Sequence, residues 1–67
     1  MRIRELRKAR RVTQLKMAMD LDMSQNTISR YESGEREQGV AELIRIADYF
    51  RVSIDYLVGR TDDPAMH

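Results

Sequence analysis

Apolar residues recur every three or four positions along almost the entire chain, and this helical spacing constrains the fold more than any other feature. No segment alternates apolar and polar residues with the period of two that a half-buried strand requires. The capping residues Thr13, Ser24 and Ser53 divide the pattern, and Gly34 follows its third segment. The sequence therefore predicts an all-α bundle of five short helices. The first covers residues 2–10, the second is capped by Thr13 and gives way to a turn at Leu21-Asp22-Met23, the third runs from Gln25 to about Ser33, the fourth runs from Val40 to about Phe50, and a short fifth is capped by Ser53.

The chain has 67 residues, which is enough for one domain with a small core. We expect residues 1–60 to form this domain and residues 61–67 to form a polar C-terminal tail. Apolar residues on the inward side of each predicted helix make up the expected core: Ile3, Leu6, Met17, Ala18, Leu21, Ile28, Leu43, Ile46, Ala47, Phe50, Val52, Ile54 and Leu57.

The residue inventory argues against catalytic and metal-binding sites. The chain has no Cys, its single His is the last residue, His67, and its three Gly are dispersed. These residues cannot supply a thiolate site, a His-based nucleophile pair or a glycine-rich phosphate loop. The adjacent Asp62 and Asp63 are typical of a charged tail. We expect a protein that is not an enzyme and has no cofactor, metal or small-molecule ligand. No apolar run approaches the roughly 20 residues of a membrane span, so we expect a soluble cytoplasmic protein.

Basic residues concentrate at the start of the chain. Six of the 12 fall within the first eleven positions, where Glu5 is the only acidic residue. Acidic residues gather later, so the net charge of +1 conceals an asymmetric distribution. This asymmetry can orient a protein on a polyanion, although a solvated amphipathic helix would produce the same pattern.

The predicted helix over 25–33 differs from the others because it offers little to a core. Its only large apolar residues are Ile28 and Tyr31, and much of the remainder is Ser, Asn and Thr, which are mediocre helix formers. A helix that serves only as a structural surface would more often carry Glu, Lys, Ala and Gln.

The outward positions of this helix carry side chains that suit the edges of DNA bases. At about 100° per residue, the residues left for solvent are Gln25, Asn26, Ser29 and Arg30. Gln and Asn can bond bidentately to adenine, and Arg can bond to guanine, in the major groove. A helix, a short turn and a second helix form the arrangement that presents such a recognition helix.

An ordered set of residues extends along nearly the whole chain: Thr13-Gln14, Ala18, Leu21, Ser24, Thr27-Ile28-Ser29-Arg30-Tyr31-Glu32, Gly34-Glu35-Arg36, Leu43, Ile46-Ala47, Val52-Ser53, Asp55-Tyr56-Leu57 and Gly59. This set resembles the phage-repressor (Cro/XRE-type) helix-turn-helix family over roughly residues 2–60. The resemblance implies a lambda-repressor-like bundle of five helices, the second and third of which read DNA. It also implies a transcriptional regulator, most often a repressor, that binds double-stranded operator DNA as a dimer.

The resemblance also implies roles for individual residues. Contacts to bases are implied for Gln25, Asn26, Ser29 and Arg30. Contacts to phosphates are implied for Gln14, Ser24, Thr27 and Arg36. Arg7 and Glu32 match a pair that bridges the first and third helices, and its role is structural because an unpaired charge there would be costly.

The chain departs from the family pattern at a few positions. Arg11, Asp22 and Arg51 occupy turns where the family often has Gly. A residue other than Gly with a positive φ costs about 1 kcal/mol, so we expect modest strain or slightly different turns. Leu15 stands where the family usually has a polar residue, and it is either a contact for a partner or a singly exposed Leu without consequence.

Two other interpretations remain open. The chain could be a DNA-binding antitoxin that also neutralises a second protein. It could instead be a helical protein-interaction module that grips a partner through the third helix or the surface around Leu15 and Tyr56. For the homodimer, the candidate surfaces are the fifth helix and the loop over residues 36–38, and the two copies could pair in solution or only on DNA.

Overall fold

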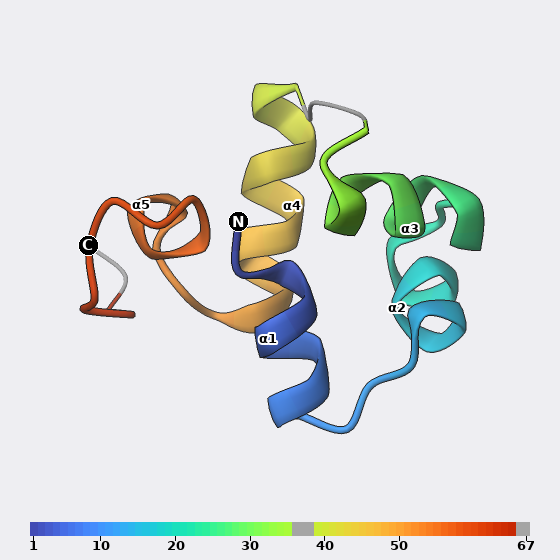
Figure 1. Cartoon of the computed structure of the whole chain (residues 1–67), viewed down its shortest axis with the longest axis horizontal. Coiled ribbons are helices and arrows are strands. Elements are labelled where there is room, and N and C mark those ends of the chain that lie inside the picture. Colours follow the sequence, from blue (N-terminus) through green and yellow to red (C-terminus); the bar gives the residue numbers. More distant parts are fainter. Residues whose placement is uncertain (36–38, 66–67) are drawn as a thin grey trace.

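The computed structural model describes residues 1–35 and 39–65, and every regular element in this part of the chain is a helix. The five helices are α1 Ile3–Ala9, α2 Gln14–Leu21, α3 Gln25–Ser33, α4 Val40–Phe50 and α5 Ile54–Leu57 (Figure 1). The prediction of an all-α fold is confirmed. The first helix, α1, is shorter than its predicted range by one residue at each end.

Three helices begin at the predicted capping residues, Thr13, Ser24 and Ser53. In each case the side-chain oxygen accepts a hydrogen bond of 3.0 to 3.1 Å from the backbone N–H three residues later. Each bond satisfies a donor that the first turn of a helix leaves unpaired. At the other end of α3, Gly34 has the expected left-handed conformation, with a φ of 80°.

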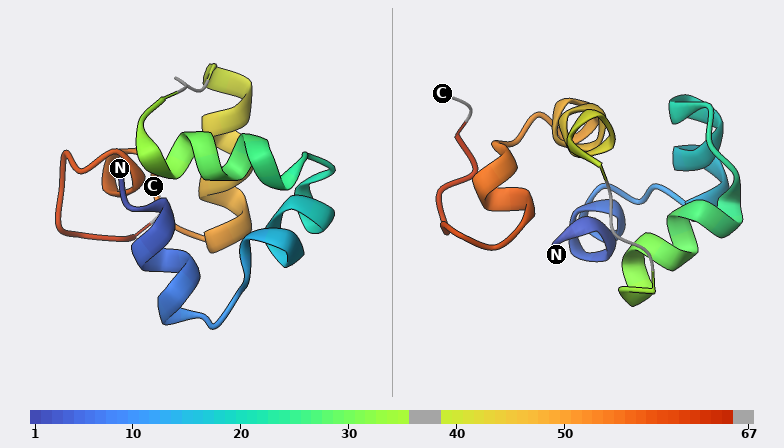
Figure 2. Two further views of the ribbon diagram at one scale, coloured as in Figure 1. Left: turned by 45° about the vertical axis from the view of Figure 1, so that its right-hand side comes forward. Right: turned by 90° about the horizontal axis from the view of Figure 1, so that it is seen from above.

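The helices are arranged so that α1 and α4 stand between α5 on one side and the α2–α3 pair on the other (Figure 1; Figure 2, right). A short turn over residues 22–24 joins α2 to α3, and the two helices pack against each other. All five helices contribute to one core, whose fully buried large side chains are Ile3, Met17, Ile28, Ile46, Phe50 and Leu57.

The core differs from the prediction at a few positions. Tyr31 is buried, whereas Leu6 and Leu43 are half-buried and pack against the edge of the core. The prediction for Ile54 is wrong, because this residue is 38% exposed. Since α5 has only four residues, its single turn brings Leu57 into the core and leaves the first residue of the helix outside.

Three turns have the left-handed geometry that the family often builds with Gly. Arg11, Asp22 and Arg51 each have a φ of 56°, and the last two residues end α2 and α4. These positive φ values agree with the expectation of modest strain at the three positions. The strain costs about 1 kcal/mol at each arginine and less at Asp22, because Asp tolerates this conformation better.

The described part of the C-terminal segment is hydrogen-bonded to the helices. The Arg2 guanidinium donates to the backbone oxygen of Tyr56 at 2.9 Å and to the Asp62 carboxylate at 3.0 Å. The backbone N–H of Ser53 donates to the carbonyl of Pro64 at 3.1 Å. The division into a domain and a tail stays a prediction. None of the helices described is long and apolar enough to cross a membrane.

Candidate nucleic-acid interface

The outer face of α3 is polar and exposed, while its inner face anchors the helix in the core. Ile28 and Tyr31 are buried, with 0% and 4% of their surfaces exposed. All four side chains assigned to base contacts are exposed: Gln25, Asn26, Ser29 and Arg30. No hydrogen bond or ion pair occupies the Arg30 guanidinium within residues 1–35 and 39–65. The face therefore presents amide, hydroxyl and guanidinium groups that retain hydrogen-bonding capacity for a ligand.

A shallow hollow lies between the first turn of α2 and the outer face of α3. Its volume is about 330 Å³, and the residues lining it are Gln14, Gln25, Asn26 and Ser29. The structure thus brings one predicted phosphate contact together with three predicted base contacts. The lining carries both hydrogen-bond donors and acceptors but no formal charge, a composition that suits the edges of bases more than a free anion.

Beneath this face, a buried carboxylate joins the first three helices. The Glu32 side chain is 0% exposed, and the Arg7 side chain, at 12%, is nearly buried. Arg7 donates to Glu32 through Nε at 2.8 Å and through Nη2 at 3.2 Å. Gln14 Nε2 and Arg4 Nε also donate to Glu32 Oε1, at 3.2 and 3.3 Å. One carboxylate therefore fixes α3 against both α1 and the start of α2.

These contacts determine the charge of Glu32. Burial raises the pKa of its carboxyl group, but the hydrogen bonds from Arg7, Gln14 and Arg4 have the larger combined effect, so the pKa lies below its ordinary value. The hydrogen bond to Glu32 likewise raises the pKa of Arg7 against the opposing effect of burial. Both groups are therefore ionised at neutral pH, where the pair is charged inside the fold.

Besides its predicted contact to a phosphate, Gln14 contacts Glu32, which the sequence did not indicate. Its Nε2 donates one hydrogen to Glu32, and a carboxylate can only accept, so the orientation of the amide group is fixed. The second Nε2 hydrogen and the Oε1 atom remain for the hollow. Glu32 thus holds the side-chain amide of Gln14, which is the predicted phosphate contact, in one orientation.

Ser24 and Thr27 form a pair at the start of α3. The Ser24 hydroxyl caps the helix by accepting from the Thr27 backbone N–H at 3.1 Å, and the two hydroxyl oxygens lie 2.8 Å apart. The bond between the hydroxyls uses one of their two hydrogens, so the other can be donated to a phosphate oxygen. Arg36, the remaining predicted phosphate contact, lies outside the described residues.

Two contacts that sequence reasoning missed attach α2 to α4. Tyr49 Oη donates to Asp20 Oδ2 at 2.6 Å, and Lys16 Nζ lies 2.9 Å from the other oxygen of the same carboxylate. The Arg45 guanidinium donates to the backbone carbonyl of Leu21 at the end of α2. Burial, together with the bond to Asp20, raises the pKa of Tyr49 to about 12. Only the one-turn spacing of Lys16 and Asp20 offered a local signal for this cluster.

Comparisons with known proteins agree with this geometry. A family model described as helix-turn-helix matches residues 3–57. The chain is 33% identical over 63 residues to "Uncharacterized HTH-type transcriptional regulator YobD" of Bacillus subtilis, covering 94% of this chain and 56% of that protein. It is 41% identical over 59 residues to "Cryptic phage CTXphi transcriptional repressor RstR" of Vibrio cholerae, covering 88% and 53%. Against "HTH-type transcriptional regulator ImmR" of Bacillus subtilis the identity is 31% over 61 residues, covering 91% and 48%.

The chain spans about half the length of these curated relatives. Their names place them among transcriptional regulators rather than among enzymes. No solved structure matches the chain significantly.

Proposed function

Because the chain belongs to the helix-turn-helix family, of the Cro/XRE type, we propose that it is a transcriptional regulator that reads operator DNA with α3 in the major groove. One observation carries the proposal. The inner side of α3 is fixed by Ile28, Tyr31 and Glu32, while its outer side carries polar side chains that no core requires. A helix held so firmly with its polar groups outward suits recognition of base edges.

Individual side chains divide this task by chemistry. Gln25 and Asn26 suit bidentate bonding to adenine, and Arg30 suits bonding to guanine. Ser29, between them on the same face, can donate to or accept from a base edge. For the backbone, Gln14 has one amide hydrogen to offer and the Ser24–Thr27 pair has one hydroxyl hydrogen. We assign Arg36 to a phosphate on the resemblance alone. Phosphate contacts set the register, and base contacts set the sequence preference.

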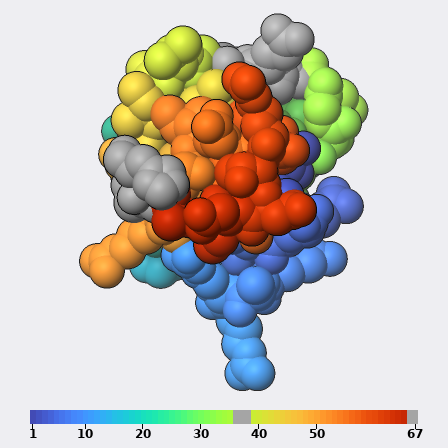
Figure 3. Space-filling view, turned by 90° about the vertical axis from the view of Figure 1, so that its left-hand side faces the viewer, coloured from blue at the N-terminus to red at the C-terminus, as the bar shows by residue number. Residues whose placement is uncertain are grey.

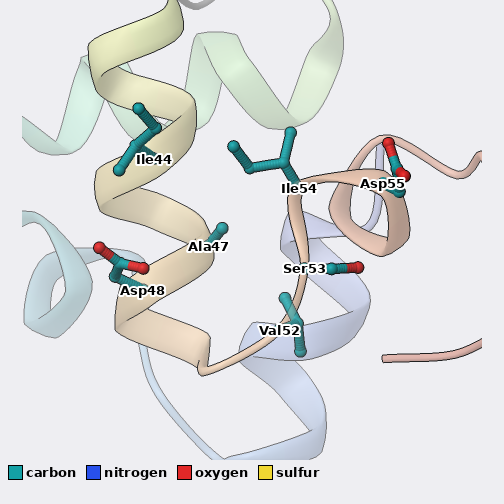
Figure 4. A pocket seen from close by; sticks show the side chains of 7 residues that line it. All are labelled: Ile44, Ala47, Asp48, Val52, Ser53, Ile54 and Asp55. Carbon is teal, nitrogen blue, oxygen red and sulfur yellow. The ribbon is translucent and has the colours of Figure 1, made fainter. Parts of the chain in front are cut away.

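We further propose that two copies bind one operator, because a recognition helix of nine residues spans only part of a helical turn of DNA. An apolar hollow of about 370 Å³ between α4 and α5 supports self-association (Figure 4). Ile54 points across it toward Ile44 on α4, and these residues are 38% and 44% exposed. A pair that closes this surface should hold its recognition helices about 34 Å apart, one turn of DNA.

The regulator acts by repression in this proposal, which the name of the relative RstR as a transcriptional repressor supports. Contacts of the kind described need no cofactor, metal or small molecule. A regulator must reach its operator DNA, so we place the protein in the cytoplasm.

Selection of binding sites from random duplex DNA tests the proposal. We expect one enriched motif with two related halves, which the wild type binds and which Gln25→Ala and Asn26→Ala variants bind about 1–3 kcal/mol more weakly while keeping the wild-type melting temperature. Mobility shifts on the selected duplex should weaken steeply with salt. Failure to enrich any motif would exclude sequence-specific DNA binding.

A further inference from the structure

Three basic residues on α1 and just after it lie next to the candidate nucleic-acid interface. Arg4 and Lys8 lie one turn apart on α1, and the backbone N–H of Arg11 donates to the carbonyl of Lys8 at 3.1 Å, so the Arg11 backbone turns back onto the last turn of α1. All three residues are exposed. We call Arg4, Lys8 and Arg11 the α1 basic surface. Arg10 does not belong to it, because its guanidinium lies 5.5 Å from the centre of the Phe50 ring.

The α1 basic surface adjoins the hollow between α2 and α3. Arg4 and Gln14 both donate to the same atom, Glu32 Oε1, at 3.3 and 3.2 Å. Gln14 in turn lines the hollow together with residues of α3. The cations of α1 therefore extend the polar interface from its α2 edge, and α1 lies beside α3 in the view from above (Figure 2, right).

Neighbouring carboxylates do not neutralise this surface. Arg4 and Arg7 share the single charge of Glu32, and Arg7 holds it at the shorter distance of 2.8 Å. Lys8 and Arg11 form no ion pair with any other residue that the structure describes. Seven basic residues and one acidic residue give positions 1–16 a net charge of +6, while positions 17–67 carry −5.

We infer that the α1 basic surface is a second DNA contact, which binds phosphates of the backbone beside the bases that α3 reads. The ligand is double-stranded DNA of any sequence, because charges on an exposed helix recognise the polyanion and not base edges. Acidic residues lie instead beyond position 16, among them Asp55 of α5 and Asp62 and Asp63 of the C-terminal segment; Figure 3 shows this part of the chain at the centre of its view, with part of the α1 region in blue at the edge. The resulting charge separation turns the α1 side toward DNA during approach. This inference rests on the proposed function.

A charge-matched pair of variants tests the inference. Lys8→Gln/Arg11→Gln removes two charges from the surface, and the control Arg51→Gln/Arg60→Gln removes two charges elsewhere. Each pair includes an arginine with a φ of 56°, so the change in backbone strain is also matched. The probes are the selected operator and a short random-sequence duplex, titrated by fluorescence anisotropy at about 50 to about 200 mM KCl.

Each phosphate contact contributes about 0.9 to the slope of log K against log salt. We expect the Lys8/Arg11 variant to lose about 1.8 of this slope on both probes, so that wild-type affinity falls about tenfold more than the affinity of the variant across the salt range. The control should keep the wild-type slope, and the charge-conserving Lys8→Arg/Arg11→Lys variant should restore it.

An unchanged slope in Lys8→Gln/Arg11→Gln, or an equal loss in the control, overturns the inference. In that case the proposed function stands as long as Gln25→Ala still loses operator preference. If the wild type shows no preference for any selected duplex, the proposed function fails instead, and binding to the random duplex alone decides the inference.

Discussion

The α1–α2–α3 side of the molecule and the α4–α5 side differ in both charge and polarity. On the first side, Glu32 is buried among three donors and the surface above it carries amides, hydroxyls and cations. On the second side, exposed Ile44 and Ile54 face a hollow whose rim carries Asp48 and Asp55 (Figure 4).

The difference separates two kinds of partner. A polyanion is attracted by the first side and repelled by the carboxylates of the second, whereas an apolar protein surface gains most from covering the second. A bundle of five short helices can thus hold a DNA interface and a protein interface on different helices. The two sides share only a small core, so each can be altered with the other as its control.

The largest effect should come from removing the partner of the buried carboxylate. We expect Arg7→Ala to lower the free energy of unfolding by about 3 kcal/mol, because the loss of one partner strands a buried charge. Urea titration followed by circular dichroism measures this change. Arg4→Ala, which removes an exposed donor from the same carboxylate, should cost less than about 1 kcal/mol. Equal losses in the two variants would contradict the central role of Arg7.

Low pH should first destabilise the α1–α2–α3 side, because this side contains the buried Glu32 carboxylate. The unfolded chain titrates Glu32 near the ordinary pKa of 4.5, and the folded chain holds that pKa lower. The stabilisation by Glu32 is therefore complete above the unfolded value and is lost as the pH falls through the folded value. Urea midpoints from about pH 6 to about pH 3 should fall less in Glu32→Gln than in the wild type. Parallel curves for the two proteins would show that other carboxylates dominate acid unfolding.

Replacement of the outward amides should weaken recognition and leave the fold intact. We expect Gln25→Ala or Asn26→Ala to cost about 1–3 kcal/mol on the selected operator and much less on random DNA. Anisotropy titrations on both duplexes measure the difference. Ser33→Ala, at the exposed end of the same helix, is the control. An equal loss on both duplexes would mean that these residues hold the backbone and do not read bases.

Local chemistry explains why most of the fold could be predicted from the sequence. The capping side chains of Thr13, Ser24 and Ser53 act on N–H groups three residues away, so their effect is visible in a short window. The inward spacing of apolar residues in α4 is equally local. Ile54 was misjudged because a helix of one turn is too short for periodicity to show which residue faces inward.

The side-chain contacts around the interface lacked such a signal. Gln14 meets Glu32 across 18 positions of sequence, and Tyr49 meets Asp20 across 29. Polar residues at these positions are equally compatible with solvent, and only the packing of α2 against α3 and α4 brings them together. The Arg7–Glu32 pairing was expected from the family resemblance and could not be deduced from spacing.

A charge placed in the apolar hollow between α4 and α5 should weaken self-association through that side of the molecule. Ile44→Glu puts a carboxylate beside Asp48 and removes an exposed apolar contact, so we expect self-association to weaken about tenfold, or about 1.4 kcal/mol. Sedimentation equilibrium measures this in solution, and binding to an operator with two half-sites measures it on DNA. Met19→Glu, on α2 and 71% exposed, is the control. If both variants associate as the wild type does, the hollow is not the dimer surface.

The smallest predicted effect comes from making the same substitution, Arg to Gly, on each of the two sides of the molecule. Arg11 and Arg51 have the same φ of 56°, a conformation that Gly adopts without the steric penalty of a Cβ. Arg11→Gly and Arg51→Gly should therefore each raise the free energy of unfolding by up to about 1 kcal/mol, since relief of strain exceeds the added entropy of the unfolded chain. Only Arg11→Gly should also weaken DNA binding, because Arg11 belongs to the α1 basic surface. Thermal melts and anisotropy on the same samples separate the two contributions. If Arg51→Gly weakens DNA binding as much as Arg11→Gly, the two sides of the molecule do not differ in their partner.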